Sequence, residues 1–166
     1  MSREIVGKLK ADGEDFEWYP TTSKILNVIK GDLREDVSIL DCGAGDGRAL
    51  EFLTDGSRYA IEKSNYLMSL LFEKGIVITG TDFNQSTLID KEVDVIFCNP
   101  PYSEYAAWAS KIIREANSEY IYLVIPSRWT SSNTIKLAIE ERGCEAKVLG
   151  SDDFLDADRA ARAKID

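Results

Sequence analysis

Short apolar runs alternate along the chain with longer segments in which apolar residues recur every three or four positions. The short runs are rich in Val, Ile, Leu and Tyr, as expected of buried β-strands. They lie at 37–40, 57–62, 76–79, 93–98, 119–125 and 144–150. The longer segments have the period of amphipathic helices; in 103–116, for example, Trp108 and Ile112 are four residues apart. This alternation predicts an α/β fold with a mostly parallel sheet.

Local signals define several of the predicted helices. Thr22 or Ser23 can cap a helix that carries Ile25, Leu26 and Ile29 on one face, and Ser64 can cap another. Further helices are predicted at 46–54, 65–74, 103–116 and 130–142, and a loop with a short helix at 152–163. Because parallel strands end at the same edge of a sheet, the loops after the first four strands should meet there.

Composition limits the kinds of chemistry that the chain can perform. The 166 residues, 44% of them apolar and 30% charged, suit one globular domain. There is no histidine, which excludes imidazole-based catalytic triads and argues against a metal site. Cys42, Cys98 and Cys144 lack paired spacing, so reduced thiols are expected. We find no signal peptide and no apolar run that could span a membrane, and therefore expect a cytoplasmic protein without a membrane partner.

A glycine-rich loop follows the first predicted strand. The segment "DCGAGDG" places Gly43, Gly45 and Gly47 between a strand and a helix, where glycine lets the backbone approach a ligand closely. Arg48 stands where the dinucleotide-binding pattern requires its third glycine. The loop taken alone is also compatible with a tight turn that binds nothing.

Three acids mark the ends of the first three strands. Asp41 ends the first strand, Glu62 ends the second and Asp82 follows the third. A carboxylate after the second strand can accept both ribose hydroxyls, and one after the third can accept an adenine amine. Three acids at successive strand ends favour a nucleoside-binding edge over solvent-exposed loop acids.

This arrangement resembles the class I S-adenosylmethionine-dependent methyltransferases. The resemblance implies a three-layer Rossmann-like sheet, mostly parallel, and S-adenosylmethionine as the cofactor. It assigns cofactor binding to Asp41, Cys42, Gly43, Ala44, Gly45 and Gly47, to Glu62 and Lys63, and to Asp82 and Phe83. The family's core has seven strands; in this chain we expect the seventh to be missing or truncated.

The fourth predicted strand runs into "NPPY", residues 99–102. This segment resembles the catalytic motif of methyltransferases that modify a planar nitrogen, namely an exocyclic base amine or a glutamine amide. The resemblance implies that the Asn99 side-chain oxygen and the Pro100 carbonyl grip the amine, that Pro101 stiffens the turn, and that Tyr102 offers a flat surface for a base. Asn99 is also expected to contact the cofactor.

Two further stretches narrow the resemblance. "EWYPTTSKIL" is similar to the amino-terminal cofactor motif of adenine-specific amino-methyltransferases, which implies that Pro20, Thr21 and Thr22 contact the methionine end of the cofactor. "YLVIPSRW" is similar to the fifth strand and following loop of that group, with Pro126 and Trp129 near the substrate cleft or simply packed. Phage and prophage DNA adenine methyltransferases are the most similar as a whole.

These observations predict one methyltransferase domain over 1–166, with 1–30 as the amino-terminal cofactor-motif segment and no target recognition domain. The expected reaction is methyl transfer to the exocyclic amine of adenine in DNA. Transfer to RNA or to a protein glutamine, and a non-catalytic cofactor-binding subunit, remain alternatives. The net charge of −9 counts against strong independent binding to nucleic acid. It makes the protein acceptor more credible. The missing recognition domain predicts that the domain is supplied elsewhere, in a longer protein or a partner subunit, or that the enzyme reads little sequence.

Overall fold

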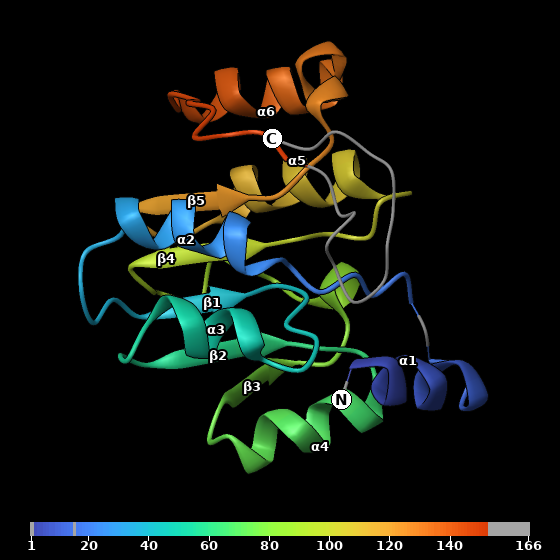
Figure 1. Cartoon of the computed structure of the whole chain (residues 1–166). Helices are drawn as coiled ribbons and strands as arrows, with labels where there is room; N and C mark the ends of the chain where they lie inside the picture. Colours follow the sequence, from blue (N-terminus) through green and yellow to red (C-terminus); the bar gives the residue numbers. More distant parts are fainter. Residues whose placement is uncertain (1, 15, 153–166) are drawn as a thin grey trace.

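The computed structural model describes residues 2–14 and 16–152 and has five parallel strands in one sheet. Their order across the sheet is β3-β2-β1-β4-β5 (Figure 1). The strands are β1 (Ile39–Asp41), β2 (Arg58–Ile61), β3 (Val77–Gly80), β4 (Val95–Cys98) and β5 (Tyr120–Leu123). The predicted three-layer, Rossmann-like α/β fold with a parallel sheet is confirmed.

Helices cover both faces of the sheet. On one face lie α2 (Ser23–Asp32) and α3 (Arg48–Leu53), with α4 (Asn65–Glu73) next to β3. On the other face α5 (Tyr105–Glu115) packs against the sheet and α6 (Asn133–Arg142) packs against α5 (Figure 1). The remaining elements are α1 (Ser2–Ala11) and two short 3₁₀ helices, η1 (Phe83–Gln85) and η2 (Ser127–Ser131).

The predicted caps of two helices are confirmed. Thr22 is the N-cap of α2, and its hydroxyl accepts a hydrogen bond from the Ile25 amide. Ser64 is the N-cap of α4 and accepts from the Leu67 amide in the same way. Each cap satisfies one of the free N–H groups in the first helical turn, so local sequence determines where these helices begin.

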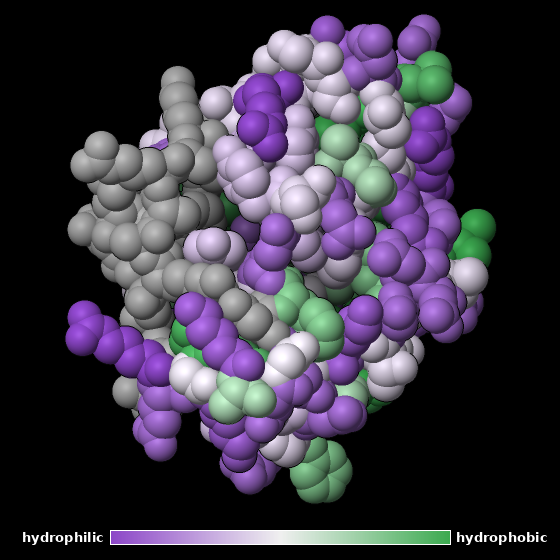
Figure 2. Space-filling view, turned by 90° about the vertical axis from the view of Figure 1, so that its right-hand side faces the viewer, coloured by the Kyte–Doolittle hydropathy of each residue, from purple (hydrophilic) through white to green (hydrophobic). Residues whose placement is uncertain are grey.

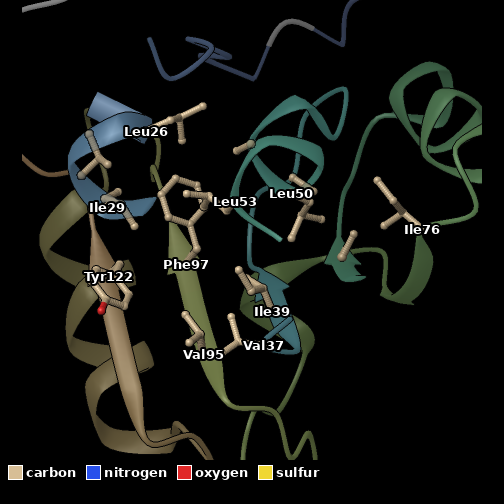
Figure 3. Close-up of a cluster of buried hydrophobic side chains, with 14 of the residues drawn as sticks. Leu26, Ile29, Val37, Ile39, Leu50, Leu53, Ile76, Val95, Phe97 and Tyr122 are labelled. Atoms are coloured by element: carbon tan, nitrogen blue, oxygen red, sulfur yellow. The ribbon is translucent and has the colours of Figure 1, made fainter. Parts of the chain in front are cut away.

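The main hydrophobic core lies between the sheet and the layer formed by α2 and α3. Figure 3 shows Leu26 on α2 and Leu53 on α3 with their side chains toward Phe97 on β4. A second cluster on the opposite face includes Leu40, Ile96 and Ile112. Successive strand residues therefore bury alternate faces against different helix layers, which is why these strands are apolar on both sides.

The topology brings the ends of β1, β2 and β4 together. The chain passes from β3, at one edge, back to β4 beside β1, so strand order reverses between β1 and β4. Asp41 lies in register with Ala60 of β2 and with Phe97 of β4. The loops that follow these three strands therefore begin side by side. Open α/β sheets bind ligands where the strand order reverses in this way.

The predicted sixth strand at 144–150 is wrong, because this segment forms neither strand nor helix. The segment was predicted as one of the short apolar runs, but the side chains of Cys144, Ala146 and Val148 are exposed. Only Leu149 packs against the core, so no buried face stabilises strand pairing. Within the described residues β5 is consequently an edge strand. The predicted loop and short helix at 152–163 lie outside the described residues, except for Asp152.

Candidate cofactor and acceptor site

A cavity of about 310 Å³ opens at the carboxyl ends of β1, β2 and β4. It brings together most of the residues that the sequence assigned to the site. Those lining it are Pro20, Thr21, Asp41, Cys42, Gly43, Ala44, Glu62, Lys63, Asp82, Phe83, Asn99 and Pro101. Figure 2 views the molecule from the side at which the strands end; outside the grey atoms, hydrophilic and pale residues dominate and hydrophobic ones are scattered.

Five assigned residues do not line this cavity: Thr22, Gly45, Gly47, Pro100 and Tyr102. Thr22 is occupied as a helix cap. Gly45 and Gly47 belong to the same loop but do not line the cavity, and their φ angles of 57° and 81° favour glycine. A Cβ atom at Gly45 would collide with the Trp18 ring. The course of the loop therefore strongly favours glycine at that position.

The carboxylate of Glu62 ties the second strand end to the glycine loop. Its Oε2 accepts a hydrogen bond from the Gly45 amide at 2.8 Å, and its Oε1 accepts from the Lys63 and Ser64 amides at 2.9 Å each. Burial raises the pKa of Glu62, and these three N–H groups act against that rise. Since a carboxylate offers about four acceptor positions, Glu62 retains capacity for a ligand hydroxyl.

Asp41 is the most deeply buried acid of the site. Its side chain is 2% exposed, and its Oδ1 accepts a hydrogen bond from the Gly43 amide at 3.0 Å. Burial raises the pKa of Asp41 to about 7; the Gly43 N–H opposes the rise and the negative charge of Glu62 adds to it. Asp41 is thus poised between its charged and neutral forms near neutral pH, as is common in functional sites.

An aromatic wall closes the cavity on the side of β3 and α5. Phe83 and Trp108 stack with ring centroids 4.0 Å apart, and Trp108 also lies against Gly43. The Nε1–H of Trp108 is buried and has no hydrogen-bond partner, the one such side-chain atom among the described residues. The sequence suggested only a packed helical position for Trp108; its contact with a glycine 65 positions away was not visible in the helical period.

The side chain of Asn99 is held in a defined orientation. Its Nδ2 donates to the Tyr19 carbonyl at 2.8 Å and to the Thr21 hydroxyl at 3.1 Å. An amide has two N–H donors at one end and an acceptor oxygen at the other. Because both donors are engaged with this amino-terminal segment, the Oδ1 end is the one left to accept a hydrogen bond from a ligand.

The partners of Asn99 belong to a short segment that lines the cavity. We call residues 16–21 the strap. Glu17 of the strap accepts hydrogen bonds from the Ser103 amide at 3.1 Å and the Ser103 hydroxyl at 2.8 Å. The strap therefore joins the glycine loop, through Trp18 against Gly45, to the loop after β4. Sequence reasoning placed Pro20 and Thr21 near a ligand but did not detect these contacts with the loop after β4.

Tyr102 lies on the outer side of the loop after β4. The guanidinium of Arg128, from η2, is 4.9 Å from the centre of the Tyr102 ring and 5.3 Å from that of Tyr105. Trp129, the next residue, packs against the apolar cluster between α5 and α6 and lines a separate cavity of about 270 Å³ near β5. Of its two expected environments, Trp129 thus occupies the packed one.

No protein-family model matches the chain, and no curated protein matches it in sequence. Solved structures do match. The 23S rRNA methyltransferase ErmE has a TM-score of 0.70 and 16% identity, over 89% of this chain and 66% of its own. An S-adenosylmethionine-dependent O-methyltransferase from Thermotoga maritima has a TM-score of 0.57 and 18% identity, over 89% and 65%. The plantazolicin methyltransferase BpumL, solved with S-adenosylhomocysteine, has a TM-score of 0.50 and 19% identity, over 84% and 62%.

These likenesses establish the fold, which is that of the class I S-adenosylmethionine-dependent methyltransferases. The chain spans slightly less than two thirds of the length of each of these three structures. Across the described residues, no helix has the length and apolarity needed to cross a membrane.

Proposed function

We propose that this protein transfers a methyl group from S-adenosylmethionine to the amine of a planar, conjugated acceptor, with the exocyclic amine of adenine in DNA as the first candidate. The observation that carries the proposal is the orientation of Asn99. Its Oδ1 is left to accept a hydrogen bond because Tyr19 and Thr21 engage the nitrogen. The side chain borders the cavity formed by the glycine loop and the strand-end acids.

The cavity fits the cofactor on three counts. Gly43 lines the cavity without a side chain of its own, beside the ring of Trp108. Glu62 and Asp82, after β2 and β3, both border the cavity as carboxylate acceptors for a ribose hydroxyl and an adenine amine. The unpartnered Nε1–H of Trp108 is a buried donor that a ligand acceptor would satisfy.

The protein's own residues then have separate tasks. The cofactor, when bound, would supply an electrophilic methyl group whose sulfur leaving group departs as a neutral thioether and needs no acid; the methylated amine would then release one proton to solvent. Asn99 Oδ1 and the Pro100 carbonyl would each accept one N–H of the acceptor amine, turning its lone pair toward the methyl group. Pro100 and Pro101 have no N–H and keep this turn out of regular secondary structure. Catalysis would come mainly from positioning and electrostatics, which suits a chain without histidine.

RNA is the second candidate acceptor. The solved structure with the highest TM-score among those compared above is a 23S rRNA methyltransferase, and the same grip on an exocyclic amine serves a base in either nucleic acid. The net charge of −9 gives no support for tight phosphate binding by the chain alone. For both acceptors, affinity would then depend on a recognition element outside this chain.

The test is transfer of a labelled methyl group to DNA, RNA and total protein, followed by identification of the modified nucleoside. We expect label in N6-methyladenine from DNA. Label in RNA alone would replace DNA by the second candidate, and label in protein would indicate glutamine as acceptor. Cofactor binding by calorimetry without any labelling would support the non-catalytic subunit instead.

Two substitutions separate the proposed roles. Asn99→Ala should lower methyl transfer on the order of 10²-fold and leave the Kd for the cofactor nearly intact, because its main effect is to remove an acceptor for the amine. Glu62→Gln should raise the cofactor Kd roughly tenfold, because an amide replaces the carboxylate that would accept a ribose hydroxyl. The reverse pattern would show that the two roles have been exchanged.

A further inference from the structure

We infer that the strap, residues 16–21, sets the catalytic orientation of Asn99, and that Thr21 is a positioning residue whose hydroxyl holds the Asn99 side-chain amide. This inference rests on the proposed function, since it assigns Thr21 to the grip on the acceptor amine. The sequence resemblance assigned Thr21 to the methionine end of the cofactor. Its contact in the structure is with the side chain that would hold the acceptor.

The geometry leaves the amide one favourable orientation. The Tyr19 carbonyl has no proton and can only accept, so a flipped Asn99 would place two oxygens 2.8 Å apart. Thr21, which is 7% exposed, adds a second acceptor 3.1 Å from the same nitrogen. Together they engage both N–H groups of Asn99. A flipped amide would present N–H groups to the acceptor amine, which carries N–H groups of its own.

The strap is anchored to the same loop at a second point. Glu17 accepts from the backbone amide and from the hydroxyl of Ser103, four residues beyond Asn99. Glu17 has a φ angle of 55°, uncommon for a residue with a side chain, and the contact with Ser103 accompanies it. Anchors on both sides of the Pro-Pro turn fix the position of the strap along the catalytic loop.

The experiment compares Thr21→Val, which removes the hydroxyl and keeps the shape, with Thr21→Ser, which keeps the hydroxyl. Loss of one hydrogen bond to the amide should lower kcat/KM for the acceptor roughly 2- to 10-fold in Thr21→Val. Thr21→Ser should restore most of it. The Kd for S-adenosylmethionine, measured by calorimetry, should change less than about twofold in both variants, because the contact is with Asn99.

Thr54→Val provides a matched control for the loss of a buried hydroxyl. Thr54 is 4% exposed, and its hydroxyl donates to the Val37 carbonyl at 2.6 Å, away from the cavity. The Thr54→Val variant should be less stable than the wild type but have the same kcat/KM per folded molecule. If Thr21→Val raises the cofactor Kd and leaves kcat/KM at saturating cofactor unchanged, Thr21 serves the cofactor and the inference is overturned.

A readout independent of activity is the ¹⁵N–¹H signal pair of the Asn99 side-chain amide, identified by its loss in Asn99→Asp. Both protons should exchange slowly with solvent in the wild-type protein. One of them should exchange on the order of tenfold faster in Thr21→Val. Unchanged exchange would refute the positioning role even where activity falls. If the wild-type protein labels no acceptor, the proposed function fails, while this measurement still decides whether the strap orients the amide.

Discussion

The buried carboxyl of Asp41 should make the folded protein less stable as the pH rises, and Asp41→Asn should remove this loss of stability. Burial raises the pKa of Asp41 from its usual 3.8 to about 7. Since one pKa unit corresponds to about 1.4 kcal/mol, ionising this group costs about 4 kcal/mol more in the folded protein than in the unfolded chain. Asparagine is neutral at every pH and its oxygen can still accept from the Gly43 amide.

The sign follows from which state holds the proton. Between pH 3.8 and about 7 the folded protein keeps the Asp41 proton and the unfolded chain releases it. The contribution of Asp41 is therefore fully present below pH 3.8 and is lost as the pH rises through about 7. The unfolding free energy of Asp41→Asn minus that of the wild type should rise by about 4 kcal/mol between pH 4 and pH 8.

Urea unfolding at several pH values in this interval measures that difference, because groups common to both proteins largely cancel. Asp94→Asn is the control of opposite sign. The amide and hydroxyl of Ser38 lower the pKa of Asp94, so its contribution is present above the unfolded pKa and lost as the pH falls. A flat difference curve for Asp41→Asn, or one that falls with pH, would refute the reasoning about its burial.

Three other substitutions test the site. Gly45→Ala should destabilise the protein by about 1–3 kcal/mol and change tryptophan fluorescence, because left-handed strain is joined by a collision with Trp18. The control is Gly143→Ala, which has a similar φ of 64° but open space around it and should show only the cost of the left-handed strain. A loss of stability equal to that of Gly45→Ala would contradict a contribution from the collision with Trp18. Trp108→Phe keeps the aromatic stack and removes the unpartnered N–H; calorimetry should show cofactor affinity reduced roughly 2- to 10-fold, and unchanged affinity would mean that the ligand does not use this donor. Arg128→Met should lower stability by only about 0.5–1 kcal/mol in thermal unfolding, because its contacts with two tyrosine rings are exposed; a larger loss would indicate a structural role for the loop.

The sequence was sufficient for the fold because its signals were local and mutually consistent. Apolar runs identified the strands, and Thr22 and Ser64 identified helix starts by their capping chemistry. The segment 144–150 was predicted as a strand from its apolar residues, but only Leu149 packs against the core, and an apolar run alone does not reveal whether a neighbouring strand is available. Helix α1 was missed although Ile5 and Leu9 are four residues apart; they are buried in a cluster with Leu67.

The site was predictable where topology alone brings residues together. Asp41, Glu62 and Asn99 converge because parallel strands end at one edge of the sheet. Contacts made by side chains across the cavity could not be read from spacing, and the hydrogen bonds from Asn99 and Ser103 to the strap are the main examples. Tyr102 followed its motif in sequence, but its ring packs against Arg128 outside the cavity.

Contacts between the strap and the loop after β4 join positions 78 to 86 residues apart, and they form outside the sheet. Among the described residues, the apolar clusters on the two faces of the sheet contain no strap residue, and only Trp18 packs against the small cluster between α1 and α4. Local opening of the strap would therefore release Asn99 with little change in the melting temperature. A screen for heat resistance alone would therefore not select for variants in which the strap stays attached beside Asn99. Hydrogen exchange at the strap amides would measure the free energy of local opening separately from that of global unfolding.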